Sequence, residues 1–166
     1  VKKMERTVEI KKIGKEDAGV LYDMIREMAG YEHELEEVKT SKQKIEQTIC
    51  SGMDANCFIA WVDGEPAAYV VYFYTYSTYL GCRNLYVEDV FVRPAYRNLG
   101  LGAKILRFMA RLAVQEGCPR MDWTCLDWNT NAISFYKHLG ASHLKERYYF
   151  RADGKALEEL ARTKEA

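Results

Sequence analysis

The sequence predicts a mixed α/β fold, in which helices flank a central twisted sheet that is mixed but mostly antiparallel. Segments with the two-residue alternation of strands are interspersed with segments whose apolar residues recur at helical spacing. Two of the expected strands are joined by Asp63-Gly64-Glu65-Pro66, a turn sequence that predicts an antiparallel hairpin. Because the chain has 166 residues and 48% of them are hydrophobic, we expect one domain over residues 1–166.

Five elements are expected in the first half of the chain. They are strands over residues 7–12, 57–62 and 67–76 and helices over residues 20–30 and 41–51. Polar and apolar side chains alternate in the first strand, and the acidic Glu16 and Asp17 are typical of the first turn of a helix. Gly30 is the expected end of the first helix, and Ser41 is the expected N-cap of the second.

Six elements are expected in the second half. They are strands over residues 84–93, 120–126 and 141–151 and helices over residues 103–116, 131–139 and 156–162. Pro94 ends the first of these strands because it has no N–H to donate to a neighbouring strand. Gly140 is the expected stop of the middle helix, and the many aromatic residues of 141–151 predict a final strand.

Charge and composition argue against several classes of partner. The 24 Lys and Arg residues balance the 24 Asp and Glu residues, so the basic excess that favours nucleic acid is missing. The longest apolar run, residues 66–73, is far shorter than the about 20 residues that cross a bilayer, and no leader-type segment precedes it. Five cysteines without a C-x-x-C pair predict reduced thiols, and three scattered histidines predict no metal. We expect a cytoplasmic protein with neither nucleic-acid nor membrane partners.

A glycine-bearing loop between a strand and a helix is the strongest functional signal. Gly100 and Gly102 let main-chain N–H groups approach an anion, and the following helix presents its positive dipole end. Arg97 can add charge-assisted contacts to phosphate oxygens. The spacing fits neither the dinucleotide-binding fingerprint nor the P-loop, and an ordinary strand-to-helix turn is the alternative.

The segment Arg97-Asn98-Leu99-Gly100-Leu101-Gly102 matches R/Q-x-x-G-x-G/A, so the chain resembles the GNAT superfamily of acetyl-CoA-dependent N-acetyltransferases. Three further segments resemble its spermidine/spermine and thialysine N-acetyltransferase branch. They are Met28-Ala29-Gly30-Tyr31-Glu32, Leu126-Asp127-Trp128-Asn129 and Phe135-Tyr136-Lys137-His138-Leu139-Gly140-Ala141. Glu88-Asp89-Val90-Phe91-Val92, directly before the loop, is similar as well. Asn98 stands where the branch has glycine, a replacement that is tolerated because asparagine adopts left-handed backbone angles more readily than most residues.

The resemblance implies a set of cofactor contacts. Main-chain groups of Val90, Phe91 and Val92 would pair with the pantetheine arm of acetyl-CoA in the manner of an added strand. Asn129 would hydrogen-bond the cofactor, and Tyr136 would lie near the thioester sulfur. The pyrophosphate would be held by the loop and the start of its helix, namely Arg97, Asn98, Leu99, Gly100, Leu101, Gly102 and Ala103.

The chemistry of acetyl transfer explains why a base and an acid are expected. An alkyl amine with a pKa near lysine's, about 10.4, must lose a proton before it attacks the thioester. Glu88 is the candidate base, through an ordered water or by stabilising the ammonium, and N–H groups near Val90 would stabilise the oxyanion. Tyr136 would protonate the departing thiolate. A covalent route through Cys125 is the weaker alternative, because the implied reaction is a direct transfer.

The substrate that the resemblance implies is a small cationic amine. Tyr31, Glu32, Glu88 and Glu146 are the candidate substrate contacts, and the other acids of the segment Glu34 to Glu37 are interpreted as a solvated loop. Thialysine or another lysine-like amino acid is favoured, and a diamine or polyamine comes second. Acetylation of a protein or peptide, or a CoA-binding domain without turnover, are the alternatives. The branch also implies a homodimer.

Overall fold

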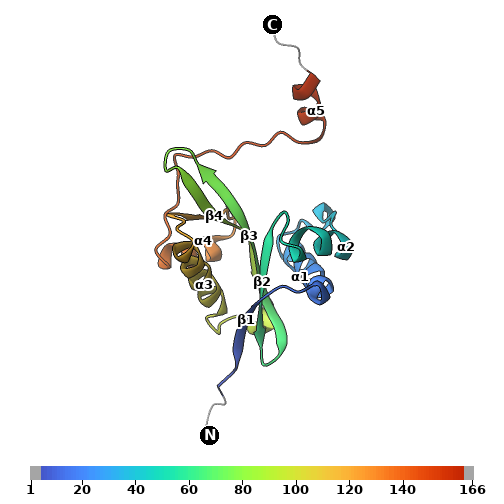
Figure 1. Ribbon diagram of the computed structural model, residues 1–166, viewed down its shortest axis with the longest axis vertical. Coiled ribbons are helices and arrows are strands. Elements are labelled where there is room, and N and C mark those ends of the chain that lie inside the picture. Colours follow the sequence, from blue (N-terminus) through green and yellow to red (C-terminus); the bar gives the residue numbers. More distant parts are fainter. Residues whose placement is uncertain (1–4, 163–166) are drawn as a thin grey trace. The chain divides into compact units, whose positions relative to one another are not determined.

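The computed structural model describes residues 5–162 and divides into two compact units, one up to Thr124 and one from Cys125 onward. Figure 1 shows the sheet and three helices in the first unit and two helices in the second. One domain over residues 1–166 stays a prediction.

The first unit is built on a five-stranded sheet in the order β1-β2-β3-β4-β5. Its strands are β1 (Val8–Lys12), β2 (Asn56–Val62), β3 (Glu65–Ser77), β4 (Cys82–Val92) and β5 (Met121–Asp122). The first four strands pair antiparallel, and β5 pairs parallel with β4. The predicted mixed, mostly antiparallel sheet is confirmed.

Helices cover both faces of this sheet (Figure 1). They are α1 (Ala18–Tyr31), α2 (Lys42–Ile45), which continues as a π-helix over Glu46–Cys50, and α3 (Leu101–Gln115), with 3-10 turns at Lys15–Asp17, Leu35–Glu37 and Pro94–Tyr96. Side chains of β3 alternate between two cores: Val70 and Tyr72 pack with α3, whereas Tyr69 and Val71 pack with α1 and α2. Since both faces are covered, β3 is an almost continuous apolar run.

The first helix ends one residue later than predicted, and for a different reason. Gly30 lies inside α1, and the chain leaves the helix at His33, whose φ of 62° is left-handed. The N–H of His33 donates to the carbonyl of Gly30, and the N–H of Glu34 donates to that of Ala29. This pair of bonds is a Schellman motif with His33 where glycine is commoner. Ser41 caps α2 as predicted, by accepting a bond of 3.2 Å from the N–H of Lys44.

The β2–β3 hairpin has a shorter turn than predicted. Only Asp63 and Gly64 form it, with φ of 51° and 82°, whereas Glu65 and Pro66 already belong to β3. Positive φ at both central residues matches the right-handed twist of paired strands, and Asp-Gly is a favoured sequence for such a turn. The N–H of Thr7 donates to the Asp63 carboxylate at 2.9 Å and anchors the turn to the chain before β1.

The second unit contains α4 (Thr130–His138) and α5 (Gly154–Arg162). Gly140 follows α4 with φ of 95°, which confirms its predicted role as the helix stop. The predicted strand over residues 141–151 is wrong: this stretch forms no helix or strand, and Tyr148, Tyr149 and Phe150 are exposed. Aromatic residues favour a strand only when a neighbouring strand is present for pairing and packing. For the same reason the predicted strand over 120–126 is reduced to β5.

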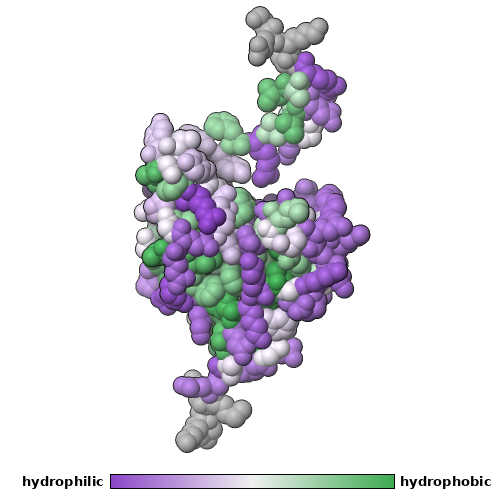
Figure 2. Space-filling model, viewed as in Figure 1, coloured by the Kyte–Doolittle hydropathy of each residue, from purple (hydrophilic) through white to green (hydrophobic). Residues whose placement is uncertain are grey.

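Figure 2 shows a largely hydrophilic surface over α1 and α2 and hydrophobic patches on α5, where Leu157 and Leu160 are exposed. No helix of the described residues has the length and apolar character that crossing a membrane requires.

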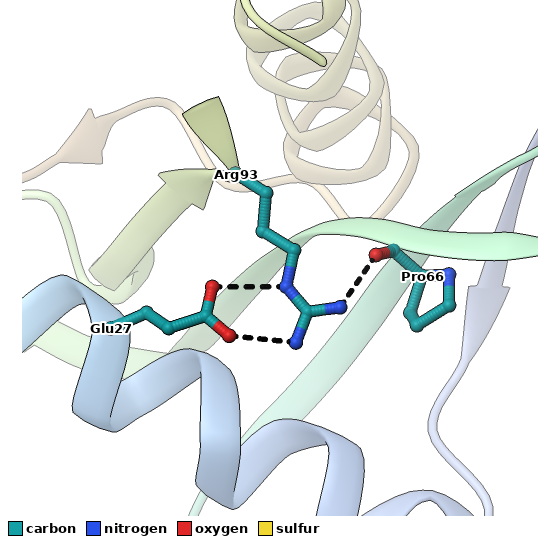
Figure 3. A network of polar contacts seen from close by, with 3 residues as sticks. All are labelled: Glu27, Pro66 and Arg93. Atoms are coloured by element: carbon teal, nitrogen blue, oxygen red, sulfur yellow. Dashed lines mark hydrogen bonds and ion pairs between the residues drawn. The ribbon is translucent and has the colours of Figure 1, made fainter. Parts of the chain in front are cut away.

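An ion pair ties α1 to the end of β4 (Figure 3). Arg93 Nε and Nη2 donate to the two carboxylate oxygens of Glu27 at 3.0 and 2.8 Å. Its Nη1 donates at 3.0 Å to the main-chain carbonyl of Pro66. One guanidinium therefore holds a helix and two strands together, and Glu27 is engaged in the fold.

Replacement of Arg93 with methionine is expected to lower the free energy of unfolding by about 1 kcal/mol. A two-point pair is worth more than a single contact, but these side chains are 24% and 40% exposed, so solvent screens the pair. Urea denaturation measures the loss. Glu9→Gln is the matched control, because its pair with Lys11 is on the open surface. Equal stability of the two variants would contradict a structural role for Arg93.

Candidate active site

The centre of the candidate site is an irregularity in β4. Val71 of β3 pairs with Asp89, and the next residue, Tyr72, pairs with Val87, so Glu88 is an extra residue on β4. Such a β-bulge changes the direction in which neighbouring side chains point. Val87 packs in the core beneath α3, whereas Phe91, four residues later, packs on the opposite face with α1. Glu88 is exposed at the bulge, and Asp89 is partly buried.

A cavity of about 280 Å³ lies beside Asp89, between α1, the loop that follows α1, and the sheet. Met28 and Ile25 contribute apolar walls from α1, and Tyr69 contributes from β3. Glu32, Glu34, Glu37 and Asp89 bring four carboxylates to the lining, and Lys39 brings an ammonium. The predicted substrate residue Glu32 and the loop acids thus meet in one place. Glu88 is outside this lining.

Asp89 is the most perturbed acid of the cavity. Burial, the largest cause, and the charge of Glu88 raise the pKa of Asp89 from 3.8 to about 6. Its Oδ2 accepts a hydrogen bond of 3.3 Å from the hydroxyl of Tyr69, which acts in the opposite direction by stabilising the ionised form. Burial and the charge of Asp89 raise the pKa of Tyr69 well above its ordinary value, so this phenol stays protonated and donates. A carboxylate that titrates near neutrality can exchange protons with a substrate.

Glu32 and Tyr31, the predicted substrate pair, end α1 at the rim of this region. Burial, followed by the charge of Glu34, raises the pKa of Glu32. The guanidinium carbon of Arg97 lies 5.1 Å from the ring centroid of Tyr31 and 5.8 Å from that of Phe91. Arg97 Nε also donates to the carbonyl of Val92 at 3.0 Å. Arg97, which is predicted to bind the cofactor, is therefore in contact with Tyr31, which is predicted to bind the amine.

The loop after β4 has the backbone geometry of an anion-binding turn. Asn98 and Gly100 have φ of 65° and 70°, which confirms the left-handed conformation expected at Asn98. The helix begins at Leu101, two residues before its predicted start, so Gly102 and Ala103 belong to its first turn. The N–H groups of a first helical turn have no acceptor within the helix. These main-chain N–H groups at the start of α3 are among those predicted to bind the pyrophosphate.

Val90, Phe91 and Val92, the strand residues before the loop, have a neighbouring strand on one side only. Val90 pairs with Val70, Phe91 with Tyr69 and Val92 with Ala68 of β3. On the other side, β5 pairs only with Leu85 and Tyr86, so within residues 5–162 no strand covers β4 beyond that point. Main-chain groups along an open strand edge can pair with an extended, amide-bearing ligand.

Three of the predicted site residues belong to the second unit. Asn129 is the N-cap of α4, and its Oδ1 accepts a bond of 3.3 Å from the N–H of Ala132. Tyr136 lies within α4, partly buried, with its ring centroid 5.5 Å from that of Phe135. Glu146 lies in the irregular segment after α4 and is exposed.

Asp89, Tyr69 and Lys39 are site residues that were not identified from sequence. The acidic pair Glu88-Asp89 was visible, but alternation alone did not say which member faces the substrate. Among the described residues, no group of three or more His, Cys, Asp and Glu side chains is arranged to hold a metal ion.

Comparison with known proteins places these features in a family. A family model described as the acetyltransferase (GNAT) family matches residues 20–141. A thialysine N-epsilon-acetyltransferase of Sus scrofa is 38% identical over 160 residues, covering 87% of this chain and 92% of that protein. One of Caenorhabditis elegans is 33% identical over 159 residues, covering 94% and 98%. Among solved structures, an integron cassette protein from the Vibrio cholerae mobile metagenome aligns with a TM-score of 0.79 and 25% identity, covering 94% of this chain and 98% of that one.

Proposed function

Since the chain belongs to the acetyltransferase (GNAT) family and is an N-acetyltransferase, we propose that it acetylates the side-chain amine of thialysine or a similar lysine-like amino acid. The observation that carries the proposal is the cavity beside β4, where four carboxylates converge on a space of about 280 Å³. Such a cavity attracts a small cation. The names of the similar enzymes favour an amino acid over a diamine or polyamine.

Acetyl-CoA is the proposed acetyl donor, and the residues present fit it. The open edge of β4 at Val90, Phe91 and Val92 suits the pantetheine amides, and the first turn of α3 suits the pyrophosphate. Arg97 and the side-chain amide of Asn129 would add polar contacts. When bound, the thioester supplies an activated acetyl group.

The proposed proton path begins at Asp89. The substrate ammonium binds between Asp89 and Glu32, and Asp89 receives the proton because its raised pKa makes it a stronger base than an ordinary aspartate. Glu88, exposed at the bulge, passes that proton to solvent. The neutral amine then attacks the thioester carbonyl, and the N–H of Val90 donates to the oxyanion.

Tyr136 completes the proposed reaction as the general acid. When the tetrahedral intermediate collapses, the new C–N bond is retained, the C–S bond breaks and the sulfur leaves with the electron pair. The phenol of Tyr136 protonates that sulfur, so that CoA leaves as a thiol. The attacking nitrogen then loses its extra proton to give the neutral amide, and this proton restores the phenol of Tyr136 through solvent. We also propose that the protein is a cytoplasmic homodimer. Sedimentation analysis measures its oligomeric state.

The test of the function is a panel of amines assayed with acetyl-CoA by release of free thiol. Thialysine and lysine are compared with ornithine, putrescine, spermidine and peptides. The highest kcat/KM is expected with thialysine. Preferential turnover of peptides would overturn the small-amine assignment.

Gly100→Ala is expected to weaken CoA binding by about tenfold in calorimetry. A Cβ at Gly100 meets no atom within 4 Å, but left-handed angles cost an L-residue about 1–2 kcal/mol, so the free loop relaxes away from the binding conformation. Gly117→Ala is the matched control, because Gly117 has φ of 74° and equally open surroundings but follows the far end of α3. Equal affinities in the two variants would contradict the loop's role.

A further inference from the structure

We propose that Lys39 recognises the α-carboxylate of the amine substrate, and that this contact selects amino acids over diamines. The inference rests on the proposed function and deepens it by assigning a residue to the part of the substrate that does not react. Lys39 comes from the loop that follows the 3-10 turn Leu35–Glu37, and it lines the same cavity as Asp89.

The sheet side and the loop side of the cavity lining differ in burial. Asp89 and Tyr69 come from the sheet, where Tyr69 is fully buried and Asp89 partly so. Lys39 comes from the loop and is exposed. A substrate that places its side-chain ammonium at Asp89 therefore extends its other end toward the loop. An extended lysine-like side chain holds the α-carboxylate apart from the reacting ammonium.

Charge makes the role of Lys39 specific. A lysine-like amino acid carries two ammonium groups and one carboxylate at neutral pH, whereas the matching diamine carries only the two ammonium groups. A carboxylate that enters a cavity with four acidic side chains is repelled by them. Lys39 is the cation of the lining, and it opposes this repulsion where the α-carboxylate emerges.

Lys39 is also placed to make such a contact. Its Nζ donates to the main-chain carbonyl of Glu36, which holds the side chain against its own loop. A carbonyl is a neutral acceptor, so this bond leaves the positive charge of Lys39 in place. An ammonium has three donors, and a substrate carboxylate can take another of them. The same positive charge repels a diamine, which has no carboxylate to offset it.

The test compares two substrates that differ only in the α-carboxylate: thialysine and its decarboxylated analogue, bis(2-aminoethyl) sulfide. Lys39→Gln removes the charge and keeps an unbranched stem with a polar end, one atom shorter. The variant is expected to lower kcat/KM for thialysine by about tenfold through KM, and to raise kcat/KM for the analogue. Lys39→Arg is expected to restore the preference for thialysine. Lys42→Gln, on the exposed start of α2, is the control and is expected to change neither value.

The outcomes separate the two proposals. If the wild-type enzyme acetylates neither compound, or only the analogue, the proposed function is wrong and the inference falls with it. If the wild type prefers thialysine but Lys39→Gln lowers kcat/KM equally for both substrates, or changes neither, the function stands and the role of Lys39 is overturned.

Discussion

Replacing Tyr136 with phenylalanine is expected to lower kcat by 10²–10⁴-fold, the usual range for a general acid. The change removes one hydroxyl and keeps the ring, which packs beside Phe135 in α4. Without the phenol, the thiolate must leave unprotonated or take its proton from water. Affinity for CoA is expected to stay near the wild-type value, because the ring and the helix are retained. Single-turnover kinetics and calorimetry measure the two quantities.

Tyr148→Phe is the matched control for this prediction. It removes the same hydroxyl from the same unit, but at an irregular position where the side chain is 85% exposed. Its kcat is expected to equal that of the wild type. If Tyr136→Phe also keeps the wild-type kcat, Tyr136 has no part in the proton transfer.

Replacing Asp89 with asparagine is expected to lower kcat/KM for thialysine by about 10²–10³-fold, since the amide neither attracts the ammonium nor accepts its proton. Glu88→Gln is expected to have a smaller effect, because Glu88 is exposed and lies outside the cavity lining. A larger loss in Glu88→Gln than in Asp89→Asn would reverse the roles of this acidic pair.

The pH profile gives an independent test of Asp89. Below pH 6, log kcat/KM is expected to rise with a slope of one as pH increases, because the pKa of Asp89 is raised to about 6 and the protonated carboxyl cannot take the proton of the bound ammonium. Above this pH the profile is expected to level off, since the substrate binds as the ammonium and Asp89 is ionised. Asp89→Asn is expected to abolish the bend near pH 6. Tyr69→Phe is expected to move the bend to higher pH, because it removes a hydrogen bond to the ionised carboxylate.

The same raised pKa predicts that Asp89→Asn does not unfold the protein. Between the ordinary value of 3.8 and the folded value of about 6, the native state binds more protons than the unfolded state. The free energy of unfolding therefore falls as pH rises through this interval, by the contribution of this group. At neutral pH the asparagine is expected to be neutral or stabilising, so a loss of activity reports on chemistry. Thermal denaturation at pH 4 and pH 7 measures the sign.

Much of the fold was predictable because local chemistry determines it. Ser41 caps its helix, Asn98 has the expected left-handed angles, and Gly140 ends α4. These features depend on residues within one turn of each other. The end of α1 was wrong by one residue because two hydrogen bonds beyond the helix, rather than Gly30, determine where the chain turns.

The candidate site was less predictable because its residues are distant in sequence. Tyr69, Asp89 and Lys39 meet only through the pairing of β3 with β4 and the packing of α1 against them. The contact of Glu27 with Arg93 likewise depends on tertiary packing. Sequence identified the acidic character of the region, whereas the structure shows which acids share a cavity.

The extra residue at Glu88 has a consequence for how this strand can change during evolution. Upstream of it, odd-numbered side chains such as Leu85 and Val87 face α3; downstream, the even-numbered Val90 and Val92 do so. Deleting one residue between Val87 and Val90 would restore simple alternation and leave Phe91 on the face of α1, so it would remove the bulge without exchanging the two cores. A single deletion can therefore erase the irregularity at the site, and the packing of α1 and α3 does not oppose it.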